Sequence, residues 1–75
     1  MEKSFENGKV LHVMCGFDPT KDFSFSSRYE KQLNIPEQSM LFLIERKYGM
    51  GWRCLSTVGV VFVTEFYLKI YCRDV

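Results

Sequence analysis

The chain has 75 residues, of which 47% are hydrophobic and 16% aromatic, so it is long enough for one folded domain and too apolar to be disordered. Ten basic and nine acidic residues give a formal charge of +1, which excludes a strong global field that would attract nucleic acid or an anionic membrane. The first residues contain no apolar signal-peptide core, and three widely spaced cysteines do not resemble a secreted disulfide framework, so we expect a cytoplasmic protein.

The N-terminal part of the chain predicts a polar end followed by a β-hairpin. Residues 1–8 are polar and close with an Asn7-Gly8 turn signal, so we expect them to fray unless Phe5 docks on the domain. Lys9–Phe17 alternates with apolar side chains on both faces, which is typical of a central strand. A proline turn follows and Asp22–Ser26 alternates again, so these two segments predict the strands of a hairpin.

A short helix is expected from Ser27 to Asn34. Ser27, with Glu30 three residues later, forms a capping box that satisfies backbone N–H groups in the first helical turn. Pro36 disfavours a helical backbone at Ile35, so the helix should end there.

Two interpretations compete for Ser39–Thr57. A helix over Met40–Tyr48 has a proline near its start and a glycine just past its end, which is the favoured asymmetry. A hairpin would instead pair Met40–Lys47 with Trp52–Thr57 around the turn Gly49–Gly51. We favour the hairpin, because two glycines between two apolar runs indicate a tight reversal, and we expect one of these glycines to have a positive φ. The lone glycine-x-glycine lacks the longer pattern of a phosphate-binding loop.

The closing stretch, Val60–Arg73, predicts one long strand, because its side chains alternate between a nearly apolar face and a face that turns polar after Val63. We expect the first face to lie in the core: Phe62, Phe66, Leu68 and Ile70. We expect the second face to be exposed or bound to a partner: Tyr67, Tyr71 and Arg73. A helix would align Glu65, Lys69 and Arg73 at four-residue spacing, but β-branched and aromatic residues dominate the stretch and favour a strand. Charges inside the apolar run exclude a membrane span.

These elements together predict a single small domain over residues 1–75, of the α+β class and mostly β. We expect one strongly bent or barrel-like antiparallel sheet of about five strands, with one short helix. The reason to expect bending is the length of the closing strand, which exceeds the five or six residues of an ordinary strand.

The residue types that usually carry catalysis or bind metals do not form a motif. His12 and Cys15 would lie on opposite faces of a strand, and no Cys-x-x-Cys pair is present to hold zinc. The carboxylates are scattered, and Asp18 and Asp22 flank a turn rather than a calcium loop. We therefore expect no enzymatic activity, no metal and no cofactor, and we expect reduced cysteines.

A set of aromatic and basic residues is the candidate binding site. On the polar face of the predicted closing strand, rings alternate with cations, and the nearby Trp52 and Arg53 extend the set. Tyr and Arg are enriched at the energetic centres of protein interfaces. The candidate partner-binding residues are Tyr67, Lys69, Tyr71, Arg73, Trp52 and Arg53.

The leading hypothesis is a small non-enzymatic protein-binding module, acting as an inhibitor or accessory protein on a larger enzyme or complex. Small accessory proteins of bacteriophages are an example of this role, which is inferred from chain length and the lack of motifs. The alternative is a single-stranded nucleic-acid binder that stacks bases on the same rings and meets phosphates with the same cations. If the chain forms a homodimer, we expect the closing strand at the interface, by two-fold pairing of its edge or polar face.

Overall fold

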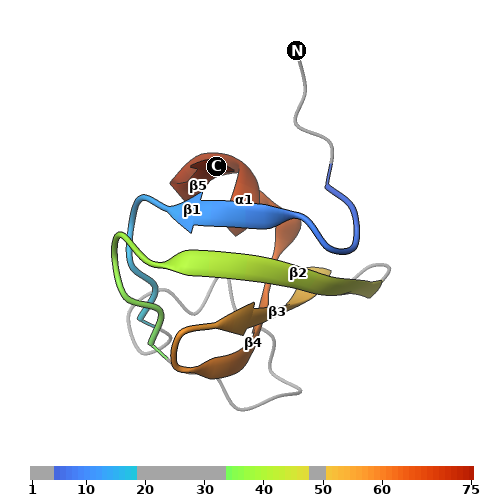
Figure 1. Ribbon diagram of the computed structural model, residues 1–75, viewed down its shortest axis with the longest axis horizontal. Helices are drawn as coiled ribbons and strands as arrows, with labels where there is room; N and C mark the ends of the chain where they lie inside the picture. The colour runs from blue at the N-terminus through green and yellow to red at the C-terminus, as the bar shows by residue number, and fades with distance from the viewer. Residues whose placement is uncertain (1–4, 19–33, 48–50) are drawn as a thin grey trace.

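The computed structural model describes residues 5–18, 34–47 and 51–75 (Figure 1). Among these residues the protein is mostly β, with one antiparallel sheet of five strands in the order β4-β3-β2-β1-β5 and one short helix. The sheet is open, with β4 and β5 at its edges, rather than closed into a barrel. The elements are β1 (Val10–Val13), β2 (Met40–Lys47), β3 (Gly51–Ser56), β4 (Gly59–Val63), α1 (Glu65–Tyr71) and β5 (Cys72–Asp74).

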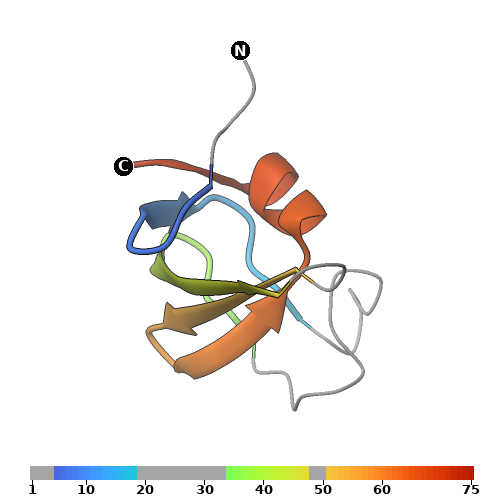
Figure 2. The same ribbon diagram turned by 90° about the vertical axis from the view of Figure 1, so that its right-hand side faces the viewer.

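One side of the sheet is packed, and the other is partly exposed on most strands but buried at Phe62 of β4, which lies opposite Arg53 and is 2% exposed. Figure 2 shows α1 on one side of the strands, and we call that side the inner face. Because successive strand residues point to opposite sides, every second residue of each strand enters the core between the inner face and α1. The core consists of Phe5, Leu11, Val13, Phe17, Ile35, Leu41, Leu43, Trp52, Cys54, Val61, Val63, Tyr67, Leu68 and Cys72.

The predicted β2–β3 hairpin is confirmed, and the competing helix over Met40–Tyr48 is wrong. The two strands pair from Phe42 opposite Leu55 to Lys47 opposite Gly51, with a β-bulge between Leu43 and Glu45. As expected, one glycine of the turn has a positive φ, which is +120° at Gly51. Residues 48–50, the remainder of the turn, lie outside the described residues.

The closing stretch is not one long strand, so that prediction is wrong. β4 ends at Val63, and the side-chain oxygen of Thr64 accepts a hydrogen bond of 3.2 Å from the backbone N–H of Tyr67, which caps the start of α1. Glu65 in the first turn and Lys69 in the last turn complement the helix dipole. These capping and charge signals, together with packing of the helix on the sheet, outweigh the weak helix propensity of the aromatic residues.

The change from strand to helix reverses three of the expected side-chain directions. Phe66 and Ile70 were expected in the core but are 63% and 52% exposed. Tyr67 was expected on the exposed face but is only 1% exposed. Phe62 and Leu68 are buried as predicted. A helix buries neighbours such as Tyr67 and Leu68 on one side, whereas alternation assigns them to opposite sides.

The N-terminal strand is shorter than expected, and the residues before it are attached to the domain more firmly than expected. β1 covers Val10–Val13 rather than Lys9–Phe17, and Phe17 instead forms an isolated β-bridge with Ile35. Phe5 docks in the core, and the backbone N–H of Gly8 donates a 2.8 Å hydrogen bond to the carbonyl of Leu43. The expected strand at Asp22–Ser26 and nearly all of the expected helix at Ser27–Asn34 lie outside the described residues.

Candidate protein-binding surface

The six candidate residues do not share one face of the protein. Trp52 and Tyr67 are buried in the core. Lys69 is exposed on α1, and Tyr71 is half-buried with its ring centroid 5.5 Å from that of Tyr67. The expectation of a single aromatic and basic face therefore fails, because it depended on a strand that is not formed.

Two of the six residues, Arg53 and Arg73, lie on the outer face of the sheet, which is the side opposite α1. Arg53 is part-exposed on β3, opposite Glu45, and the two side chains form an ion pair of 3.2 Å. Arg73 is exposed on β5, opposite His12 of β1. They occupy separate parts of the outer face, and the residues between them are apolar apart from His12.

Tyr67 has a structural role that its burial and contacts explain. Its hydroxyl donates a 2.8 Å hydrogen bond to the carbonyl of Cys15, and its ring meets that of Phe17 edge to face at 5.2 Å between centroids. A buried tyrosine whose hydroxyl has a partner contributes both apolar burial and a hydrogen bond to the core. The helix is thereby attached to the segment that follows β1.

The most prominent surface feature is an apolar row across four strands on the outer face. The sheet register places Val10 opposite Phe42, Phe42 opposite Leu55, and Leu55 opposite Val60. These four side chains are 38% to 48% exposed. Met40, two residues before Phe42 on the same side of β2, is similarly exposed. We call these five residues the apolar row: Val10, Met40, Phe42, Leu55 and Val60.

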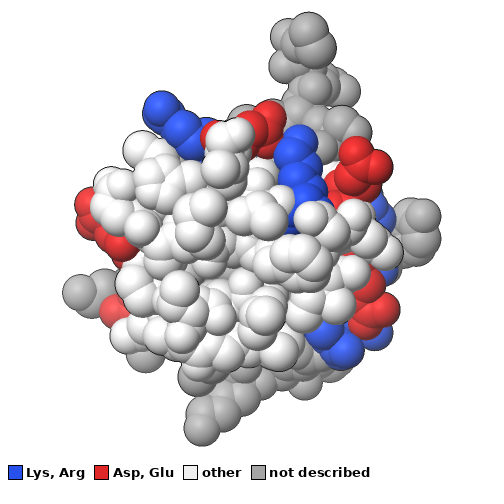
Figure 3. Space-filling view, viewed as in Figure 1, with Lys and Arg blue, Asp and Glu red and all other residues white. Residues whose placement is uncertain are grey.

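Charged side chains lie at the margins of the outer face rather than among the apolar row. Figure 3, which views this face, shows a broad uncharged centre with Lys, Arg, Asp and Glu around it. In the sheet register, Arg73 is separated from Met40 by His12, and the Glu45–Arg53 pair lies beyond Phe42 and Leu55. An apolar centre with a polar rim is the anatomy of a protein-binding surface.

Sequence reasoning missed the apolar row, although a signal for it was present. β1 and β2 carry apolar residues on both faces, as with Val10 beside Leu11 and Phe42 beside Leu43. That pattern is usual for strands that are covered on both sides. In this protein α1 covers only the inner face, so the second apolar side is left exposed.

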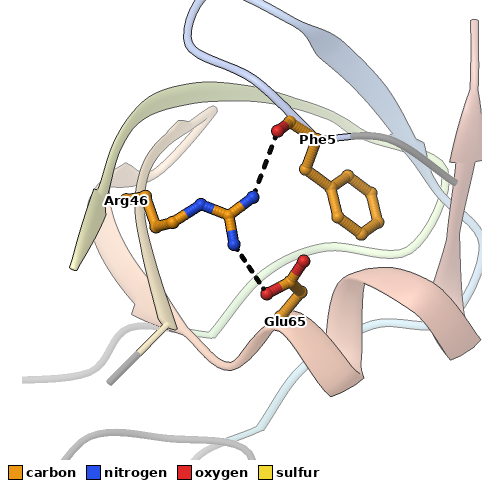
Figure 4. Close-up of polar contacts among 3 residues, drawn as sticks. All are labelled: Phe5, Arg46 and Glu65. Atoms are coloured by element: carbon orange, nitrogen blue, oxygen red, sulfur yellow. Dashed lines mark hydrogen bonds and ion pairs between the residues drawn. The ribbon is translucent and has the colours of Figure 1, made fainter. Parts of the chain in front are cut away.

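Arg46 helps to fasten the elements on the inner face. Its guanidinium donates one hydrogen bond of 3.0 Å to the carboxylate of Glu65 and another of 3.2 Å to the carbonyl of Phe5 (Figure 4). The same guanidinium lies 4.8 Å from the ring centroid of Trp52, a cation–π contact. The start of α1 and the N-terminal segment are therefore both tied to β2 and β3 on the packed side.

The cysteines are placed for packing rather than for reactivity, with one exception. Cys54 and Cys72 are buried and Cys15 is exposed, and all three carry thiols. Burial raises the pKa of the Cys54 thiol far above its ordinary value, and the nearby Cys72 raises it further. Because the thiolate is the reactive form, Cys54 is protected by its charge state as well as by its burial.

A thiol count should separate these environments. We expect a maleimide to modify one cysteine, Cys15, in the folded protein, and all three after denaturation without reductant. Intact mass spectrometry gives the number of adducts. Fewer than three adducts in denaturant would reveal a disulfide, and modification of Cys54 in the folded protein would contradict its burial.

No group of three or more His, Cys, Asp or Glu side chains that could hold a metal ion occurs within residues 5–18, 34–47 and 51–75. Over the same ranges, no helix is both long and apolar enough to cross a membrane.

No protein-family model, curated protein or solved structure matches the chain. The function must therefore be inferred from the surface itself.

Proposed function

We propose that this protein is a small, non-enzymatic protein-binding domain that uses the outer face of its sheet as the binding surface. The observation that carries the proposal is the apolar row, in which Val10, Phe42, Leu55 and Val60 are partly exposed side by side across four strands. Its role is that of a cytoplasmic inhibitor or accessory protein, which acts by covering a surface of a larger enzyme or complex.

The free energy of hydration supports this use of the outer face. Apolar surface removed from water contributes about 25 cal/mol per Å², so partly exposed neighbours gain most when one partner covers them together. Isolated exposed apolar residues are common on monomers, but a contiguous row at the centre of a face is typical of an interaction site. The charged rim would exclude water and fix the orientation of a partner.

The alternative, binding of single-stranded nucleic acid, has less support from the same face. Base stacking needs exposed rings next to cations that meet phosphates. Within the apolar row the aromatic residue is Phe42, and its neighbours in the register, Val10 and Leu55, are aliphatic. Trp52 and Tyr67, which the nucleic-acid hypothesis also used, are buried.

A pull-down with matched charge variants tests the proposal. Leu55→Glu places a carboxylate in the apolar row, and Ile70→Glu makes the same kind of change on α1, at a side chain of nearly equal exposure, 48% against 52%. We expect nuclease-treated extract of the native cell to yield a protein bound to the wild type and to Ile70→Glu. Leu55→Glu should retain at least about 30-fold less of it, the loss expected at an energetic centre of an interface.

Three results would contradict the proposal. The first is equal retention of the bound protein by Leu55→Glu and by the wild type, provided that thermal melts show both to be folded. The second is loss of the bound protein with Ile70→Glu alone, which would move the site to α1. The third is bound material that disappears on nuclease treatment, which would favour the nucleic-acid alternative.

A further inference from the structure

We infer that the occupant of the outer face is a second copy of this chain, bound in a two-fold symmetric dimer with the two sheets packed face to face. This inference rests on the proposed function, because it uses the same face, but it names a second copy rather than a larger enzyme or complex as the protein that covers this face; a larger complex would then be bound through another surface of the dimer. Two-fold dimers are the commonest protein assemblies, and their interface needs only one self-complementary patch.

The residue types of the apolar row favour a permanent self-association over a transient contact. The energetic centres of transient interfaces are rich in Trp, Tyr and Arg, whereas Leu and Val are under-represented there. The row consists of Val, Met, Phe and Leu, so it resembles one half of a divided protein core. Interfaces of permanent homodimers have this composition and are more apolar than other interfaces.

The size and shape of the face also suit a second sheet. Five strands at about 4.8 Å spacing span roughly 20 Å, and the eight residues of β2 at about 3.3 Å each span roughly 25 Å. Because the other strands have only three to six residues, the face covers roughly 400 Å² in projection, and its corrugation by side chains brings its accessible area toward the ~800 Å² per partner of a stable interface. Two sheets pack about 10 Å apart with their side chains interdigitated, as a row of branched and aromatic residues allows.

Electrostatics does not oppose the contact of two identical faces. Glu45 forms ion pairs with both Arg53 and Lys47, which leaves one positive charge at that margin, and Arg73 lies beyond His12 at another margin. With a formal charge of +1 on the whole chain, two copies repel each other little. A strongly charged partner would gain nothing from the uncharged centre of the outer face.

The dimer expected from the sequence, formed through the C-terminal strand, has a weaker basis than the outer face. β5 has only three residues, Cys72–Asp74, and it begins directly after α1. Edge pairing gains affinity from main-chain hydrogen bonds, and three residues supply few of them. The apolar row, in contrast, crosses four strands.

Sedimentation equilibrium on the full chain tests the inference, with the protein at about 1 to 100 μM. We expect the wild type and the control variant Ile70→Glu to approach twice the chain mass of 8.9 kDa. Leu55→Glu and Val60→Glu should raise the dissociation constant at least about 30-fold and sediment as monomers at concentrations where the wild type is dimeric. A monomeric wild type over the whole range, or a dimer that survives both substitutions, would overturn the inference.

A second measurement removes the dependence on folded variants. Amide chemical shifts of the wild type on dilution should change at Val10, Phe42 and Leu55, and stay constant on α1; changes confined to α1 would overturn the inference.

The failures of the two proposals are distinguishable. A monomeric wild type that retains a different protein through Leu55 refutes the dimer and leaves the proposed function intact. A monomer that retains no protein through Leu55 contradicts both.

Discussion

Replacing Gly51 with alanine is expected to lower the free energy of unfolding by about 3 kcal/mol or more, which is much of the stability of a domain this small. Gly51 has a φ of +120°, where L residues are strained. A Cβ at this position would clash with the carbonyl oxygen of Val63 and lie 2.9 Å from the Cα of Thr64, both backbone atoms that cannot rotate away. The clash falls at the junction of β4 and α1, so relief of it must move the helix.

Gly8→Ala is the matched control for this substitution. Gly8 also has a positive φ, +88°, but a Cβ built there meets no atom within 4 Å. Only backbone strain remains, so we expect a loss of about 1 kcal/mol. Urea denaturation of the two variants measures both values. Equal losses would mean that the close approach of Gly51 to Val63 is not part of the folded protein.

Tyr67→Ala is expected to destabilise the protein by about 3–5 kcal/mol, and Phe66→Ala by less than about 1 kcal/mol. The two residues are adjacent in sequence, yet Tyr67 is 1% exposed and Phe66 is 63% exposed. Removal of the Tyr67 ring leaves a cavity beside Phe17 and an unsatisfied carbonyl at Cys15. Thermal melts of both variants test the difference.

Tyr67→Phe divides the effect of Tyr67 into its two parts. It keeps the ring and removes the hydroxyl that donates to the carbonyl of Cys15, so we expect a loss of about 1 kcal/mol. If Phe66→Ala unfolds the protein and Tyr67→Ala does not, the segment after Val63 forms the strand that alternation predicts and does not form the helix α1.

The fold class and the β2–β3 hairpin were predictable because local chemistry and global packing agree there. Two glycines between two apolar runs admit few structures other than a tight turn. Strands that are apolar on one or both sides then require a sheet with a packed face, and this gives the mostly β architecture.

The helix at Glu65–Tyr71 was not predicted, because two kinds of signal conflict in it. Aromatic and β-branched residues and period-two alternation favour a strand, whereas Thr64 as a cap and the Glu65 and Lys69 pair favour a helix. The decision depends on whether Tyr67 and Leu68 can be buried together on the inner face of the sheet. That is a property of the folded protein and not of the local sequence.

The location of the proposed binding surface depends on information that alternation does not contain. The pattern shows that Val10 and Phe42 lie on one side of their strands, but not whether another element covers that side. Which side of the sheet is covered depends on the path of the chain after β4, where α1 packs on the inner face. Of the site residues predicted from the sequence, only Arg53 and Arg73 therefore lie on the outer face, and the prediction missed the apolar row.

The central claim is that another protein chain covers the outer face of the sheet in the cell. Its most direct test is photocrosslinking in the native cell, with a benzophenone amino acid at position 55 in one variant and at position 70 in another. We expect position 55 to give a crosslinked product, of twice the chain mass if the partner is a second copy, and position 70 to give none. Crosslinks from position 70 with none from position 55 would contradict the claim and place the binding surface on α1.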